Sequence, residues 1–134
     1  MRISQECDYA FRIILYFATR ELGFKADAKA VVEEQHIPLR FALKIFRKLC
    51  EAKIMKSFRG VHGGYSLLAT PADITFYHVI EAIDGPIYIN KCLRPDGECS
   101  RNAQSHCPMH DKLMILQEGF TKALDDVTFL SIVS

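Results

Sequence analysis

Three cysteines and one histidine, residue types that bind soft metals, follow one another in the second half of the chain. Their pattern is Cys92-x6-Cys99-x7-Cys107-x2-His110. Soft thiolates select iron–sulfur clusters, zinc or Cu(I). Structural zinc sites usually contain two tight ligand pairs, each separated by roughly two to four residues, and only Cys107 and His110 form such a pair here. The long polar gaps suit a larger inorganic body, so the spacing favours an iron–sulfur cluster over zinc.

Two other chemistries remain open for these cysteines. A zinc ion could stabilise the segment without any sensing role, or oxidation could join two thiols in a metal-free switch. Iron–sulfur electron carriers and thiol oxidoreductases form a third alternative. The sequence argues against that class, because it contains no Cys-x-x-Cys pair, no nucleotide-binding glycine motif and no second set of cluster ligands. We therefore expect a protein that is not an enzyme.

The other two of the five cysteines fit a structural role. Cys7 falls on the apolar stripe of the first predicted helix, and Cys50 follows Leu49 near the end of the third. Because buried cysteine behaves as a small hydrophobe, we expect both to belong to the core.

Composition predicts a folded, cytoplasmic protein. The 134 residues fit one domain with an extension, and 49% of them are hydrophobic. The first twenty residues contain charges that a signal peptide would not tolerate, and no early apolar run could span a bilayer. In the cytoplasm, cysteines indicate metal or redox chemistry rather than a disulfide framework.

The net charge of +1 hides one basic block. Between residues 36 and 65, seven lysines and arginines face a single glutamate, a net charge of +6, so the rest of the chain is acidic. Such a block indicates a polyanionic partner, although a solvated helix face would explain the charge equally well. The basic residues are Arg40, Lys44, Arg47, Lys48, Lys53, Lys56 and Arg59.

The apolar periodicity predicts the elements that carry this block. We expect helices over residues 3–22, with Ser4 as its cap, and over 27–35. A third helix over 38–52 would begin with Pro38 at its first position and bury Phe41, Ile45, Phe46 and Leu49. Two helices joined by a short turn, the second basic on its exposed face, are typical of a helix-turn-helix.

The next segment predicts a wing. Strands over 54–58 and 65–69 flank the string Arg59-Gly60-Val61-His62-Gly63-Gly64, whose glycines suit a β-hairpin loop. A helix beginning at Thr75 would end at Gly85-Pro86. An irregular segment then carries the cysteines, and Pro108 begins a last helix that extends to about residue 127.

The last helix has an apolar stripe that little of the monomer remains to cover. We interpret it as a dimer helix, while packing on the first helix is the alternative. The stripe consists of Leu113, Leu116, Phe120, Leu124 and Val127.

These elements predict a mainly α fold with a small β-hairpin wing (α+β). We divide the chain into a winged helix-turn-helix DNA-binding domain over residues 1–86, a cysteine-containing cluster loop over 87–107, and a dimerisation helix with a C-terminal tail over 108–134.

Nearly the whole chain resembles the IscR/NsrR-type (Rrf-type) bacterial regulators. The resemblance implies homodimers that bind roughly palindromic DNA operators and hold an iron–sulfur cluster on three cysteines and a weaker non-cysteine ligand. Family members report on cluster supply, iron, nitric oxide or oxidation, and some lack the cysteines. The matching strings are Met1-Arg2-Ile3-Ser4, Asp8-Tyr9-Ala10, Ile37-Pro38-Leu39, Phe41 with Ile45, Phe46 and Leu49, Arg59-Gly60, Gly63-Gly64-Tyr65 and Val79-Ile80-Glu81-Ala82-Ile83-Asp84-Gly85-Pro86.

Two fourth ligands are candidates. His110 has ligand spacing from Cys107 and is favoured for a [2Fe-2S] cluster. Asp8 aligns with a position that supplies a carboxylate across the dimer in some family members, and would suit a [4Fe-4S] cluster. The cysteine gaps are longer than in the commonest members, which leaves the nuclearity open.

The expected DNA contacts lie on the third helix and the wing. Those on the helix would enter the major groove, and Arg59 would enter the flanking minor groove, with His62 beside it at the wing tip. Arg40 and Leu43 stand where the resemblance leads us to expect polar and acidic residues, so we expect a different operator. The contacts on the helix are Pro38, Leu39, Arg40, Leu43, Lys44 and Arg47.

Overall fold

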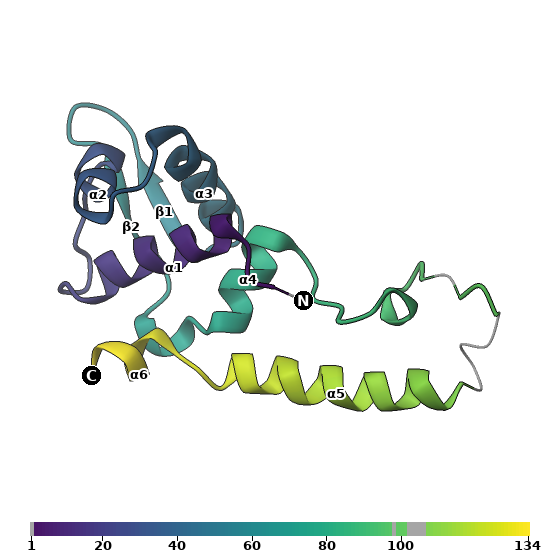
Figure 1. Ribbon diagram of the computed structural model, residues 1–134. Helices are drawn as coiled ribbons and strands as arrows, with labels where there is room; N and C mark the ends of the chain where they lie inside the picture. Colours follow the sequence, from purple (N-terminus) through teal and green to yellow (C-terminus); the bar gives the residue numbers. More distant parts are fainter. Residues whose placement is uncertain (1, 98, 102–106) are drawn as a thin grey trace.

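The computed structural model describes residues 2–97, 99–101 and 107–134, and begins with helix α1 (Gln5–Ala18) (Figure 1). Ser4 caps α1 as predicted, since its Oγ accepts a hydrogen bond from the Cys7 amide at 3.0 Å. The helix ends four residues before the predicted end. The Thr19 hydroxyl and the Arg20 guanidinium both donate to the Tyr16 carbonyl, so side chains satisfy this carbonyl of the last turn.

Helices α2 (Ala28–Gln35) and α3 (Leu39–Glu51) form the predicted helix-turn-helix. Between them His36 adopts the left-handed conformation with φ of 55°. Pro38 is the N-cap of α3 rather than its first helical residue. The prediction that Phe41 is buried is wrong: it is 38% exposed, because the buried face of α3 follows a helical period that begins at Ala42.

The wing is a two-stranded antiparallel hairpin of β1 (Met55–Phe58) and β2 (Gly64–Leu67), in which Phe58 pairs with Gly64. Tyr65 also exchanges two backbone hydrogen bonds with Ala26, of 2.8 and 3.0 Å, which fixes the wing beside the start of α2. Gly64 is required there: a Cβ on it would lie 2.7 Å from the Ala26 carbonyl oxygen.

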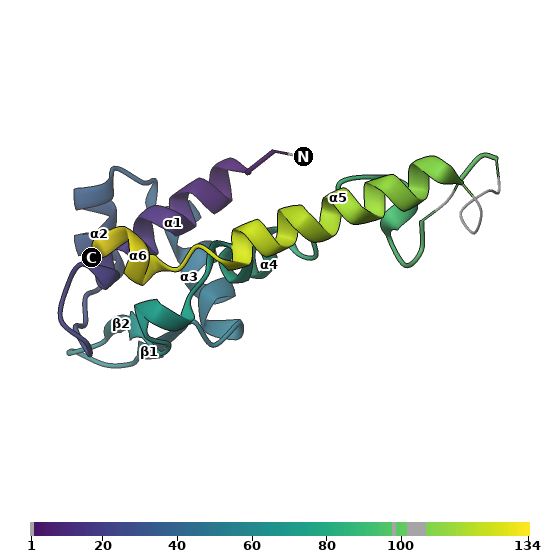
Figure 2. The ribbon, with the colours of Figure 1, turned by 90° about the horizontal axis from the view of Figure 1, so that it is seen from below.

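A 3₁₀ turn (Pro71–Asp73) leads to helix α4 (Phe76–Asp84), whose N-cap Thr75 and terminal Gly85 lie where predicted. Beyond Gly85 the chain leaves the winged domain, passes through a 3₁₀ turn (Lys91–Leu93) and returns as the long helix α5 (Pro108–Asp125). Figures 1 and 2 show α5 and the segment beside it as an arm that projects from the domain. Of the helices in the described ranges, none is long and apolar enough to cross a membrane.

The predicted apolar stripe of α5 is divided between two surroundings. Leu113 and Leu124 are half-buried against their own chain, where the Gln117 side chain also accepts a hydrogen bond from the Ile89 amide at 2.9 Å. Leu116 and Phe120 are 63% and 38% exposed. None of the residues of α5, all of which are described, is buried. One flank of the helix therefore remains uncovered in the single chain.

A short helix α6 (Phe129–Val133) follows where the sequence predicted only a tail. Phe129 is 1% exposed, and its ring lies 5.4 Å from that of Phe76 and 6.2 Å from that of Phe11, between centroids. Backbone bonds from Phe129 to the Ile74 carbonyl and from Phe76 to the Val127 carbonyl, both 3.0 Å, attach this segment to the start of α4. The C-terminal end of the arm is thereby fixed to the winged domain.

Candidate DNA interface and metal site

Helix α3 presents a basic face that the core holds in place. Arg40, Lys44 and Arg47 are exposed, whereas Ala42, Ile45, Phe46 and Leu49 are completely buried. The Phe46 ring stacks on that of Tyr65 in β2, with 4.0 Å between centroids, so the helix is fixed against the wing. Pro38, Leu39 and Leu43 are also exposed, at or near the start of α3.

Lys48 differs from the other cations of the basic block. Its Nζ donates to the Ile83 carbonyl at 2.9 Å and lies 3.2 Å from Glu6 Oε1. Only 24% of the Lys48 side chain and 21% of the Glu6 side chain are exposed. Glu6 Oε1 is buried and has ion-pair partners rather than well-directed hydrogen bonds. Lys48 therefore stabilises the junction of α1, α3 and α4, a role that its position in the basic block did not indicate.

Lys44 is partly neutralised by the same carboxylate. Its Nζ lies 3.7 Å from Glu6 Oε1, and 53% of its side chain remains exposed. The cations with open access on α3 are consequently Arg40 and Arg47, with Lys44 beside them.

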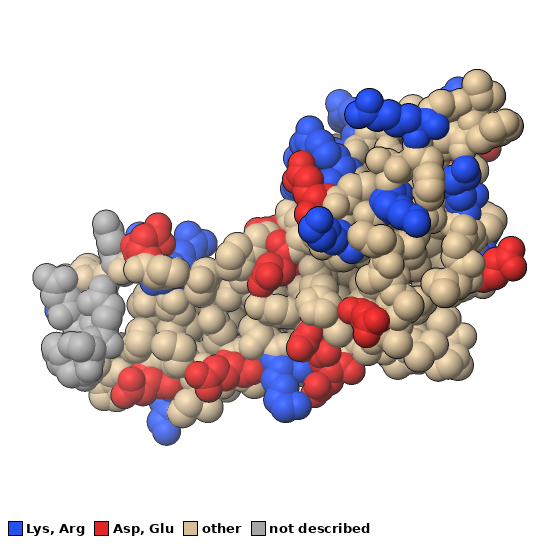
Figure 3. Space-filling view, turned by 180° about the vertical axis from the view of Figure 1, so that it is seen from behind, with Lys and Arg blue, Asp and Glu red and all other residues tan. Residues whose placement is uncertain are grey.

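The wing adds further exposed cations. Arg59 and His62 are both exposed, and the tip residue Val61 between them is 97% exposed. Lys25 and Lys56 lie over the Phe58 ring, 4.8 and 5.3 Å from its centroid. Figure 3 shows lysines and arginines gathered over the winged domain, while the arm carries both acidic and basic side chains. Such a concentration of cations on the winged domain suits docking on a polyanion.

The second candidate site lies at the far end of the arm. Cys92, Cys99, Cys107 and His110 line one cavity of about 270 Å³, together with Asn90, Lys91, Ser100, Met109 and Leu113. Segments from both sides of the arm therefore bring the four sequence-predicted donors to one place. The His110 side chain is 17% exposed.

Local geometry explains how these donors come together. Cys92 lies in the 3₁₀ turn and its Sγ accepts a hydrogen bond from Asn90 Nδ2 at 3.3 Å, a contact suited to a thiolate. Cys107 is the N-cap of α5, so His110 comes one turn later. The Gly97 backbone packs closely against the 3₁₀ turn. A Cβ on Gly97 would lie only 2.3 Å from the Lys91 carbonyl oxygen.

The donor set consists of thiols and an imidazole. In the part of the chain that the structure describes, no three His, Cys, Asp or Glu side chains form a group that could hold a metal ion. Three thiols and an imidazole nevertheless line a common cavity. Thiolate and imidazole donors are those that iron–sulfur clusters use. The residues present thus fit such a cluster.

The other predicted positions lie elsewhere. Asp8 is on α1 and forms a 2.7 Å ion pair with Arg12; the described lining of the cysteine cavity does not include it. Cys7 is fully buried, as expected, and burial together with the nearby Asp84 carboxylate raises the pKa of its thiol to about 12. Cys50 is half-buried against the core, and that burial raises its pKa too.

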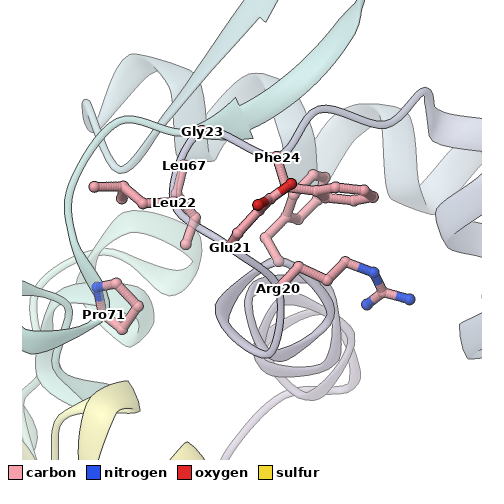
Figure 4. A pocket seen from close by; sticks show the side chains of 8 residues that line it. Arg20, Glu21, Leu22, Gly23, Phe24, Leu67 and Pro71 are labelled. Atoms are coloured by element: carbon pink, nitrogen blue, oxygen red, sulfur yellow. The ribbon is translucent and has the colours of Figure 1, made fainter.

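Another hollow lies between the end of α1 and the wing (Figure 4). It measures about 50 Å³, enough for one or two waters, and the Arg20 side chain beside it is paired with Glu34 at 3.0 Å. This hollow is too small for a ligand site.

A basic helix-turn-helix with an adjoining wing defines a winged-helix DNA-binding protein. The comparisons with known proteins agree with that class. Residues 3–134 match the Rrf2 family, described as iron-dependent transcriptional regulators, and the chain belongs to this family. It is therefore a DNA-binding transcription regulator and not an enzyme.

Relatives in sequence are named as HTH-type transcriptional regulators. An rrf2-like HTH-type regulator of Rhodobacter capsulatus is 33% identical over 114 residues, which cover 82% of this chain and 72% of that protein. The regulator IscR of Vibrio atlanticus is 28% identical over 128 residues, 96% of this chain and 72% of its own.

Solved structures support the fold. CymR, the global cysteine regulator of B. subtilis, superposes with a TM-score of 0.77 at 23% identity, covering 99% of this chain and 96% of that one. IscR of T. potens gives a TM-score of 0.73 at 19% identity, covering 99% and 86%. At these identities the likeness concerns the fold alone, which is the predicted winged helix.

Proposed function

We propose that this regulator is a homodimer whose operator binding is controlled by an iron–sulfur cluster held by Cys92, Cys99 and Cys107, with His110 as the fourth ligand. The observation that carries the proposal is the single cavity that these four side chains line. When bound, the cluster would supply reversible redox chemistry and sensitivity to iron supply, nitric oxide or oxygen.

DNA binding is assigned to α3 and the wing. Arg40, Lys44 and Arg47 would contact bases or phosphates in the major groove, together with Pro38, Leu39 and Leu43 at the start of the helix. Arg59 and His62 would lie at the flanking minor groove, where narrow A·T-rich DNA concentrates negative potential. A dimer would place two such heads on a roughly palindromic operator.

Dimerisation is assigned to the uncovered flank of α5. Leu116 and Phe120 lie on it beside Met109, which is 60% exposed. These positions recur at helical spacing, and a second copy of the helix would remove them from water. In such a dimer the alternative ligand would be Asp8 of the other subunit, as the family resemblance implies.

The end of α4 offers a route from the cluster loop to the recognition helix. Asp84 accepts hydrogen bonds from the Ser4 hydroxyl at 2.8 and 2.9 Å, and Ile83 accepts one from Lys48 of α3. The cluster loop begins directly after this end. A change in the order of the loop would therefore act on a junction that holds α1 and α3 together.

His110 is favoured over Asp8 because it lines the cavity within the same chain. Asp8 already forms an ion pair with Arg12, and it would have to give up this pair to bind a metal.

The test is anaerobic purification of the dimer with iron and sulfide analysis and visible spectroscopy. Alanine at Cys92, Cys99 or Cys107 should abolish or destabilise the cluster, whereas Cys50→Ala should retain it. Visible absorption that survives in Cys99→Ala would refute the assignment. Colourless protein with stoichiometric zinc would favour a zinc-stabilised regulator, and metal-free protein that forms a disulfide on oxidation would favour a thiol switch.

The fourth ligand is tested separately with His110→Ala and Asp8→Ala, each reconstituted anaerobically. His110→Ala should change the spectrum and shorten the lifetime of the cluster in air, while Asp8→Ala should resemble the parent. The reverse result would assign the ligand to the carboxylate and favour a [4Fe-4S] over a [2Fe-2S] cluster.

A further inference from the structure

The recognition helix carries two leucines on a surface that is otherwise basic. Leu39 and Leu43 are 41% and 47% exposed, and within the described residues neither belongs to the core nor to the half-buried side chains packed on it. Because they are four residues apart, they are neighbours on the helix surface. Arg40 and Arg47, both exposed, lie beside them on the same helix. The start of α3 therefore presents a small apolar spot next to cations.

We propose that Leu43 contacts the C5-methyl group of a thymine in the major groove and so selects thymine at one position of each operator half-site. The inference rests on the proposed function, in which α3 enters that groove. The C5-methyl of thymine is the apolar group by which the major-groove edge of a T·A pair differs from the others. Recognition helices contact base edges with their N-terminal residues, and Leu43 lies in the second turn of α3.

Duplex DNA fits both parts of this surface. Phosphates beside the groove suit Arg40 and Arg47, which the structure leaves exposed, while a leucine cannot form a hydrogen bond to any base edge. Leu43 would therefore discriminate by apolar contact alone. Burying one methyl group contributes about 0.8 kcal/mol, which corresponds to a roughly fourfold change in affinity.

The experiment isolates that methyl group. The full-length dimer first selects its preferred sequence from a random duplex pool, and each thymine of that duplex is then replaced by uracil, which lacks only the C5-methyl. At constant salt, one such replacement in each half-site should lower the affinity of the parent protein about fourfold. Leu43→Ala should bind the thymine duplex more weakly and respond equally to thymine and uracil.

One variant outside the DNA-binding surface serves as the control. Leu22→Ala truncates a 74% exposed leucine in the loop that follows α1 and should retain the full response to uracil (Figure 4). A response that persists in Leu43→Ala, or that Leu22→Ala abolishes, overturns the assignment to Leu43.

Failure of the inference and failure of the proposed function give different results. Enrichment of one sequence with no response to uracil at any thymine would overturn methyl recognition and leave DNA binding intact. If no duplex sequence is enriched, the assignment of α3 as a reading helix fails. Binding to anionic phospholipid vesicles in place of DNA, weakened in Leu43→Ala, would likewise overturn the inference in favour of a membrane surface.

Discussion

Replacing Phe129 by alanine should destabilise the winged domain, although this residue lies close to the C-terminal Ser134. The Phe129 side chain is 1% exposed and meets the Phe11 and Phe76 rings. Truncation of a fully buried phenylalanine costs about 3–5 kcal/mol, the sum of lost transfer energy and of the cavity left behind. Typical domains have a free energy of unfolding of only about 5–15 kcal/mol.

The measurement is urea unfolding followed by circular dichroism, at matched protein concentration because dimerisation would contribute to the apparent stability. At the average unfolding entropy of globular proteins, the loss corresponds to a fall in melting temperature of about 10–18 °C. Leu130→Ala is the matched control, since Leu130 is the next residue and its side chain is 46% exposed. This substitution should change the free energy of unfolding by less than about 0.5 kcal/mol. A loss below about 1 kcal/mol for Phe129→Ala would refute the packing of α6 in the core.

Three further perturbations test the interfaces and the junction. Leu116→Glu should give monomers in sedimentation, because it places a charge in the proposed apolar seam. Ile115→Glu, at a similarly exposed position on a different flank, should leave a dimer. Dimers for both variants would move the interface elsewhere. Arg59→Ala should weaken operators with A·T-rich flanks most, by about 1–3 kcal/mol in anisotropy titrations; equal affinity across operators would remove the wing from the mechanism. Lys48→Met should lower the free energy of unfolding by about 1–3 kcal/mol, since it leaves the Glu6 carboxylate without its nearer cation. The added change Glu6→Gln should recover part of the loss. No loss in Lys48→Met would show that the junction is not stabilised by this pair.

Much of the fold could be predicted from local sequence signals. Ser4 caps its helix as predicted, and Thr75 caps the helix that was predicted to begin at it, because a side-chain oxygen two or three residues before a free amide is sufficient for that role. The wing followed from glycines that a hairpin loop requires, and Gly64 occupies a backbone conformation with φ of 151°. These signals depend on neighbours in the chain, which is why the order of helices and strands could be derived without tertiary information.

The candidate sites were predicted less evenly. Cysteine is rare and its chemistry is specific, so the spacing of Cys92, Cys99 and Cys107 was sufficient to indicate a metal site. Their convergence with His110 at one cavity depends on α5 returning beside the segment that follows α4, which no local pattern specifies. Lys48 likewise belongs to the basic block in sequence, yet the fold pairs it with Glu6.

Tertiary packing alone decided the role of the C-terminal segment and the division of the α5 stripe. Phe129 lies in a short five-residue helix, whose periodicity is too brief to predict, and its burial depends on rings contributed by α1 and α4. The stripe of α5 forms one continuous seam in sequence, but Leu113 faces its own chain while Leu116 faces outward. Residue type and spacing determine which side chains prefer burial, whereas only the three-dimensional path of the chain determines which of them it covers itself.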